Sequence, residues 1–155
     1  MELKTYKCYT GKKLMPWGKA TVVKNAKGLV FLGGVTAGTE EYDVRSPDYL
    51  DKKMVVQDPG AQWRNVLEKI KAYLEELGTS LDNIIKMTLY VKGPFPNGVA
   101  RSPNNRMDIL DAFFREHCPR LASDNNPPPS ELIGIAGLAH PDMIVEIVVV
   151  AALPD

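Results

Sequence analysis

The last quarter of the chain, from Pro127 to Leu153, is the stretch that decides the fold. It reads PPPSELIGIAGL from Pro127 to Leu138, then the polar segment AHPD, and then MIVEIVVVAAL from Met143 to Leu153. Two runs rich in β-forming residues on either side of a polar turn are typical of an antiparallel hairpin. Because both runs are nearly continuous in apolar residues, we expect both faces of their sheet to be covered.

A single carboxylate, Glu146, interrupts the second run between Val145 and Ile147. Burying an acid in an apolar strand costs free energy unless the acid is paired, hydrogen-bonded or functional. The pattern therefore leaves two interpretations open. Glu146 is either a satisfied structural acid at the rim of the sheet or a member of a functional site.

Length and charge place limits on the class of protein. The chain has 155 residues, and we expect a single domain over residues 1–155 with a sizeable core. Its 19 basic and 19 acidic residues argue against a nucleic-acid-binding protein, which normally carries a basic surplus. Cys8 and Cys118 predict neither a disulfide framework nor a metal site. No secretory signal or membrane-spanning segment is visible, so a cytoplasmic protein is expected.

Three strands are expected before the first helix, at Lys4–Tyr9, Lys19–Lys24 and Leu29–Val35. A turn that carries a large aromatic side chain is predicted at Met15–Gly18. The second and third strands flank a turn at Asn25–Gly28 and are predicted to pair as a hairpin.

Two glycines, Gly33 and Gly34, lie at the end of the third expected strand. Glycines in this position indicate a bulge or the close approach of another backbone or a ligand. The segment from Thr36 to Gln57 that follows is polar and irregular, and a loop of this length is often functional or mobile. We assign no chemistry to it, because a run of charges is usually a solvated surface.

The first helix has clear start and stop signals. Asp58 precedes Pro59, which is the arrangement of an N-cap acid and a proline in the first turn, and Gly78 is a C-cap. An apolar stripe at three- and four-residue spacing is expected to face the core: Trp63, Val66, Leu67, Ile70, Leu74 and Leu77.

A strand is expected at Ile84–Val91, and a second helix begins near Ser102 and Pro103 and ends before Cys118. Its inward-facing residues are predicted to be Met107, Leu110, Phe113 and Phe114. Two helices on one face of a mixed six-stranded sheet form an α+β sandwich. A chain of this length has no third layer for the other face, so oligomerisation through the sheet is the simplest way to cover it.

Several stretches resemble the YjgF/RidA family of reactive-intermediate deaminases, also called L-PSP proteins. They cover most of the chain in the same order, at Pro16–Trp17, Gly28–Gly34, Gln62–Leu77, Gly78–Val91, Ala112–Phe114 and Val145–Ile147. The segment from Asp82 to Val91 and the closing Val-Glu-Ile are the most specific. The resemblance implies a chorismate-mutase-like α+β fold, assembled as a homotrimer with sites in clefts between neighbouring subunits.

The resemblance also implies an activity, the cofactor-free hydrolysis of enamines and imines to ketones and ammonia. Glu146 matches the acid that positions or activates the attacking water. Trp17 replaces a tyrosine that lines the cleft, and Gly33 and Gly34 match the strand end beside the substrate. Imine hydrolysis needs a water, a base and a dry pocket. Leu132 is one of the apolar residues expected to line such a pocket beside Glu146. Together with the family spacing, this favours a site role for Glu146 over a structural one.

Ser130 departs from the family pattern. The best-known deaminases have an arginine here that clamps the substrate carboxylate. Branches without that arginine have less uniform substrates, and some resemble 2-aminomuconate deaminases. Either the substrate lacks a carboxylate at this point, or another cation replaces the arginine. The candidates are Arg106, near the start of the second helix, and Arg120, in the loop before Ser130. The alternative that both are solvated surface residues stays open.

Two functions from different classes remain open. The first is a deaminase, a hydrolase of an enamine or imine intermediate that uses no cofactor and no metal. The second is a trimer of the same fold that binds a small ligand or a protein without turnover, in a family also linked to regulatory and ribonuclease-like roles. The expected partners are a small molecule and further copies of the chain. The balanced charge argues against RNA, and nothing indicates a membrane.

Overall fold

The computed structural model describes residues 1–100 and 106–155, apart from the side chains of Arg106 and Met107. Within them, helix α1 spans Pro59–Glu76 and helix α2 spans Arg106–His117. The strands are β1 Glu2–Thr10, β2 Lys13–Lys24, β3 Gly28–Phe31, β4 Ile84–Lys92, β5 Ser130–Ile135 and β6 Val145–Leu153. Short 3₁₀ helices are η1 Lys52–Met54, η2 Leu81–Asn83 and η3 Pro119–Leu121.

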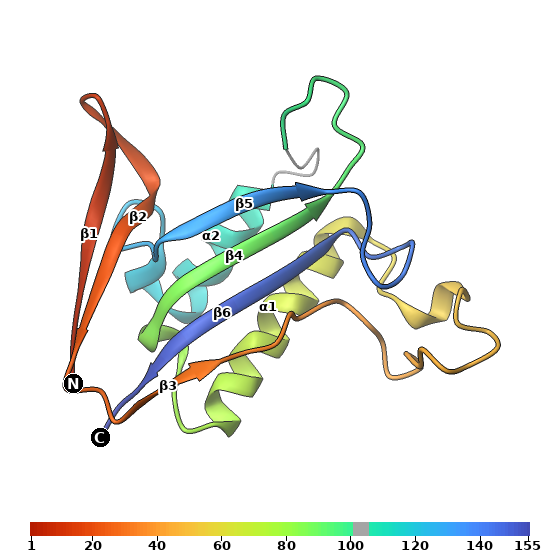
Figure 1. Ribbon diagram of the computed structural model, residues 1–155, viewed down its shortest axis with the longest axis horizontal. Helices are drawn as coiled ribbons and strands as arrows, with labels where there is room; N and C mark the ends of the chain where they lie inside the picture. The colour runs from red at the N-terminus through yellow and green to blue at the C-terminus, as the bar shows by residue number, and fades with distance from the viewer. Residues whose placement is uncertain (101–105) are drawn as a thin grey trace.

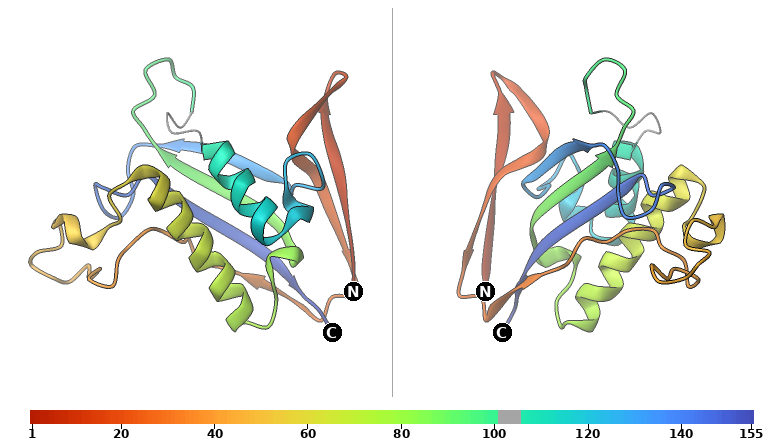
Figure 2. Two further views of the ribbon diagram at one scale, coloured as in Figure 1. Left: turned by 180° about the vertical axis from the view of Figure 1, so that it is seen from behind. Right: turned by 45° about the vertical axis from the view of Figure 1, so that its right-hand side comes forward.

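The expected α+β architecture is confirmed, because both helices lie on one face of a mixed sheet (Figures 1 and 2). The main sheet has the strand order β3-β6-β4-β5, with β4 and β5 parallel and the other neighbours antiparallel. Strands β1 and β2 form a separate two-stranded sheet that stands apart from the main sheet at the β5 side (Figure 1). The six predicted strands are thus divided between two sheets.

Helix α1 forms where its sequence signals predict it. The Asp58 carboxylate accepts a hydrogen bond from the Ala61 backbone N–H at 2.7 Å, and Gly78 follows the helix with a φ of +81°. Five of the six predicted stripe residues are fully buried: Trp63, Val66, Leu67, Ile70 and Leu74. Leu77 is 51% exposed, so its predicted burial is wrong. It is the C-cap residue, where the chain leaves the helical path and turns its side chain away from the core.

The predicted hairpin between the two C-terminal runs is wrong. Strand β4 lies between β5 and β6, so the connection at residues 136–144 passes over the end of β4. Two inter-strand spacings amount to about 10 Å, which a connection of this length spans easily. Strand β6, the most apolar strand, lies between β3 and β4, so both of its edges are paired. Its residues Val145, Ile147 and Val149 are fully buried.

The predicted hairpin of Lys19–Lys24 with Leu29–Val35 is also wrong. Strand β2 pairs with β1, and β3 pairs with β6. The predicted turn at Met15–Gly18 lies inside β2, and the chain instead reverses at Gly11, whose φ is +60°. Glycine adopts this left-handed conformation without steric cost, which places the turn earlier than the sequence pattern suggested.

The two sheets are joined at Gly18. Its backbone N–H donates to the Pro128 carbonyl at 3.1 Å, just before β5 begins. A Cβ at this position would lie 2.5 Å from the Pro127 carbonyl oxygen, so only glycine permits this approach.

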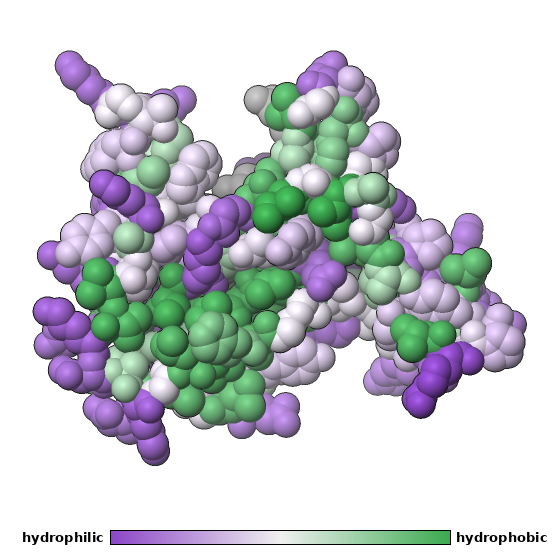
Figure 3. Space-filling model, in the orientation of Figure 1, coloured by the Kyte–Doolittle hydropathy of each residue, from purple (hydrophilic) through white to green (hydrophobic). Residues whose placement is uncertain are grey.

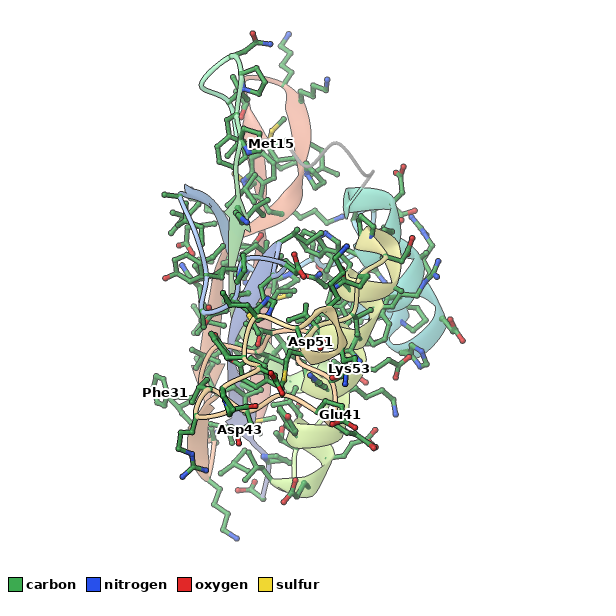
Figure 4. All side chains as sticks on the ribbon, turned by 90° about the vertical axis from the view of Figure 1, so that its right-hand side faces the viewer. Met15, Phe31, Glu41, Asp43, Asp51 and Lys53 are labelled. Carbon is green, nitrogen blue, oxygen red and sulfur yellow. The ribbon has the colours of Figure 1, made fainter. Side chains whose placement is uncertain are left out.

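One face of the main sheet is open. The helices cover the face that holds Met87, Leu89 and their register partners in β5 and β6. On the other face Leu29, Phe31 and Ile133 are 47%, 71% and 40% exposed. Figure 3 shows a broad apolar area over this part of the sheet, and Figure 4 shows Phe31 pointing away from the helices. A single chain therefore covers its sheet on one side only.

Candidate functional site

Glu146 lies in β6 on the open face of the sheet, half-buried, opposite Tyr90 in β4. Its flanking residues Val145 and Ile147 point to the helices and are fully buried. The carboxylate rests on the backbone of Gly34. A Cβ there would lie 1.6 Å from Glu146 Oε1, so a side chain at Gly34 would displace the acid. The glycines are expected to mark a bulge or the approach of a backbone or a ligand. The group that lies against Gly34 is instead the Glu146 side chain, and a Cβ at Gly33 would meet no atom within 4 Å.

Glu146 differs from the other acid of this face. Glu131 accepts hydrogen bonds from Lys86 and, at 3.1 Å, from Thr88 Oγ1, and these partners hold the pKa of Glu131 below its usual range. Among the residues that the structure describes, no hydrogen bond or ion pair joins the Glu146 carboxylate to a partner in its own chain. A structural acid normally has such a partner, so the free carboxylate is available to a substrate or a water molecule.

A groove of about 850 Å³ runs beside Gly33 and Gly34. One wall comes from the loop 36–57 and contains Tyr42, whose ring packs against Gly38. The opposite wall comes from α1 and contains Lys69. The groove and the Glu146 carboxylate share Gly34, although Glu146 itself does not line the groove, and the long polar loop forms one of the groove's walls.

Tyr42 carries a loop hydroxyl that lines the groove, and its pKa is shifted mainly by Tyr49. Its hydrogen bond to Tyr49 (3.5 Å between the two oxygens), its burial and the negative charge of Glu146 raise the pKa of Tyr42 to about 12. At neutral pH the phenol keeps its proton and can donate it in a hydrogen bond. The Tyr49 ring in turn contacts the buried His140 ring edge-on, with centroids 5.3 Å apart.

Lys69 and Asn65 complete the wall on the α1 side. The Lys69 ammonium donates to the carbonyls of Thr36 and Gly38 at 2.8 and 2.6 Å, which fastens the start of the loop to the helix. Burial lowers the pKa of Lys69. The Asn65 side-chain oxygen is buried and has no hydrogen-bond partner among the described residues. This wall offers a cation to a small polar molecule, and the unused Asn65 acceptor lies buried behind it.

Trp17, Ser130 and Leu132 line a second, smaller cavity of about 250 Å³. It lies on the helix side of the main sheet, between β2, β5 and α2. Ser130 and Leu132 pair in register with Met87 and Leu89, whose side chains face the helices, whereas Glu146 points to the opposite face. The structure thus separates the predicted site residues into two groups: Glu146, Gly33 and Gly34 in one, and Trp17, Ser130 and Leu132 in the other.

The two candidate arginines belong to neither group as the structure describes it. Arg120 donates a hydrogen bond to the Asp82 carbonyl, and its Nε lies 3.6 Å from the Asp82 carboxylate. It does not line the 250 Å³ cavity. Arg106 begins α2, but its side chain lies outside the described residues. A substrate contact from either arginine stays a prediction.

The described residues contain no group of three or more side chains that could together hold a metal ion. Within the same residues, no helix combines the length and the apolar character needed to cross a bilayer.

Sequence reasoning missed Tyr42, Tyr49, Asn65 and Lys69. The tyrosines lie far from Glu146 along the chain, in a loop whose path has no periodic pattern. The available signal was the length of the loop, since long loops in compact domains are often functional. Asn65 and Lys69 lie on the polar edge of α1, where a sequence pattern cannot distinguish a solvated residue from a site residue.

Comparisons with known proteins agree with this fold. The sequence model of the family described as Endoribonuclease L-PSP matches residues 14–153. A Rid-family protein from Yersinia pestis, YyfB, is 21% identical with a TM-score of 0.68, and the match covers 99% of this chain and 100% of that one. E. coli TdcF, solved with bound serine, is 25% identical with a TM-score of 0.57 over 84% of each chain. The YjgF gene product of E. coli is 22% identical with a TM-score of 0.57 over 96% and 93%.

Proposed function

We propose that this chain, which belongs to the Endoribonuclease L-PSP family, hydrolyses the C–N bond of an enamine or imine without a cofactor. One observation carries the proposal. The Glu146 carboxylate rests on Gly34 at the edge of a groove and has no partner among the described residues of its own chain. Isolated acids in such positions are common at catalytic sites.

The chemistry requires one group that accepts and returns a proton. Water attacks the carbon of the protonated imine, Glu146 accepts a proton from that water, and a neutral carbinolamine forms. Glu146 then returns this proton to the nitrogen. The C–N bond breaks, the carbinol hydroxyl gives its proton to the departing ammonia, and the products are a ketone and an ammonium ion. Tyr42 supports this step, since its protonated phenol lies near Glu146 and can hold a water or the substrate nitrogen by a hydrogen bond.

We further propose that the site is completed by a second copy of the chain in a homotrimer. The open sheet face exposes Phe31 and Leu29, and burying such surface stabilises an interface by about 25 cal/mol per Å². Glu146 and the Trp17 cavity lie on opposite sides of one sheet, so a cleft that uses both must join two copies. Light scattering at micromolar concentration should give about three chain masses. A stable monomer would contradict the assembly.

A mixing experiment tests the shared cleft. Glu146→Gln removes the acid, and Ser130→Trp fills the cavity from β5, so each variant alone should be inactive. If clefts join two copies, unfolding and refolding the variants together at a one-to-one ratio gives about a quarter of the clefts an intact acid and an intact cavity. Ammonia release should recover to that level. No recovery, although mass spectrometry shows mixed trimers, would place both groups in one chain or remove one of them from the site.

The second candidate is a trimer that binds a small polar ligand without turnover. The α1 wall of the groove, with Lys69 and the unpaired Asn65 oxygen, favours it, and TdcF has been solved with serine bound. Ammonia release from a panel of enamines generated in solution separates the two functions. Binding of a small amino acid with no release from any enamine would favour the non-catalytic protein.

A further inference from the structure

The cavity behind Trp17 has walls that are mainly apolar. From the sheet come Met87, Leu89 and Leu132, and from α2 and η3 come Phe114 and Leu121. Four of these five side chains are at most 5% exposed: Met87, Leu89, Phe114 and Leu121. Trp17 lies at the cavity and is 40% exposed, so it separates the interior from solvent only in part. The interior is therefore preformed and apolar on most sides.

The charged groups of the lining are acidic and already paired. Asp111 accepts hydrogen bonds at 2.7 Å from the Ser123 backbone N–H and from Arg115 Nε. Glu131 is paired with Lys86 on the outer side of β5. The described lining contains no lysine, arginine or histidine, and Arg120 is engaged with Asp82 outside it.

A carboxylate has no favourable partner in such a cavity. Removing an anion from water without a counter-charge is costly, and the cations that pair with the two acids of the lining are already engaged. An uncharged apolar group gains free energy from the same surroundings. The cavity thus selects against the negative charge that an arginine at position 130 would attract.

We propose that this cavity binds an uncharged apolar arm of the ligand, a short aliphatic chain or a single aromatic ring. Its volume of about 250 Å³ suits this size, since an apolar cavity of about 150 Å³ already accepts benzene. The inference rests on the proposed function in placing this arm on an imine substrate. The binding of the arm itself requires no turnover and is tested separately.

The experiment compares hexanamide with hexanoate, two probes with the same chain and different charge. Isothermal titration calorimetry on the assembled protein should show hexanamide binding at least about tenfold more tightly. Shortening the amide by one methylene group should weaken binding about fourfold. Leu110→Phe, which fills the cavity from α2, should abolish amide binding. Leu50→Phe is its matched control, because Leu50 is 68% exposed and far from the cavity lining.

Ser130→Arg reverses the charge selection. With a guanidinium at the cavity, hexanoate should bind more tightly than hexanamide. Tighter binding of hexanoate than of hexanamide by the wild-type protein would overturn the inference. If the Arg106→Ala variant then lost this hexanoate binding, Arg106 would be the cation responsible. Amide binding that persists in Leu110→Phe would also overturn it. Absence of ammonia release from every imine, with selective amide binding intact, would contradict the proposed enzyme and leave the cavity assignment standing.

Discussion

The groove beside Gly34 and the cavity behind Trp17 lie at opposite edges of the main sheet, the groove next to β3 and the cavity next to β5. The groove is wide, with Tyr42 and Lys69 in its walls and with Gly34, on which the Glu146 carboxylate rests, at its edge. The cavity is smaller and mainly apolar, and its acids are paired. One region therefore holds groups that can move or hold a proton, and the other holds a surface that recognises shape. Neither region alone combines a reactive acid with a dry pocket.

This difference shows how the sheet organises the chemistry. In a strand, neighbouring residues point to opposite faces, so β6 sends Val145 and Ile147 into the core and Glu146 to the open face. Strand β5, which runs parallel to β4, sends Ser130 and Leu132 to the helix side. The following predictions test whether the groove carries the chemistry and the cavity the recognition.

The largest effect is expected for Glu146→Gln. The substitution keeps the shape and removes the proton acceptor, so turnover should fall by about two to four orders of magnitude, the range for a positioned acid or base. Circular dichroism should show an unchanged fold, and probe binding in the Trp17 cavity should persist. Unaltered ammonia release in steady-state assays would make Glu146 a structural acid.

A smaller loss is expected for Gly34→Ala. The new methyl group would lie 1.6 Å from Glu146 Oε1, so the carboxylate must move, and misplacement of a catalytic group by about 1 Å costs on the order of 100-fold in rate. Gly137→Ala is the matched control, because no atom lies within 4 Å of a Cβ at that glycine. Equal kcat values for the two variants would show that the Gly34 contact does not position the acid.

A moderate loss of turnover is expected for Tyr42→Phe, which tests whether the loop 36–57 contributes to catalysis. Loss of one hydrogen bond to the reacting groups should lower kcat about tenfold, with a smaller change in KM. The raised pKa of Tyr42 adds a second readout. In the unfolded chain the phenol ionises with its usual pKa of about 10, and in the folded chain its pKa is about 12. The stabilisation from the protonated phenol is therefore complete below pH 10 and is lost as the pH rises toward 12.

Urea denaturation at pH 9, 10 and 11 measures this difference. The wild-type protein should lose more stability over that range than Tyr42→Phe, which has no phenol to ionise. Parallel curves for the two proteins would mean that Tyr42 is not perturbed by Glu146 and Tyr49.

The smallest effect is expected for Arg120→Ala. The Arg120–Asp82 pair is partly exposed, and such pairs contribute about 0.2–1 kcal/mol to the free energy of unfolding. With an uncharged arm in the cavity, KM for a neutral imine and for its carboxylated counterpart should both stay nearly unchanged. A selective rise in KM for the carboxylated imine would make Arg120 the replacement for the family arginine.

Sequence reasoning was strongest where local signals act alone. The cap at Asp58, the stripe from Trp63 to Leu74 and the glycine at position 78 specify α1 within a residue or two. It was weakest in strand pairing. The continuous apolar runs at the C-terminus specify two buried strands, but they do not specify that β4 separates them. Pairing depends on partners distant in the chain, and a two-strand pattern fits several neighbours equally well.

For the site, the sequence by itself singled out Glu146, because one acid in an apolar strand is visible without any coordinates. It also identified Gly33 and Gly34 as a point of close approach and Ser130 as a departure from the family pattern. Only the tertiary structure assigned the Glu146 contact to Gly34 and brought Tyr42 and Lys69 beside it. It also placed Trp17 with Ser130 on the other face of the sheet. The physical reason is that burial and periodicity are local properties of a sequence, whereas a site depends on which faces and distant segments the folded chain brings together.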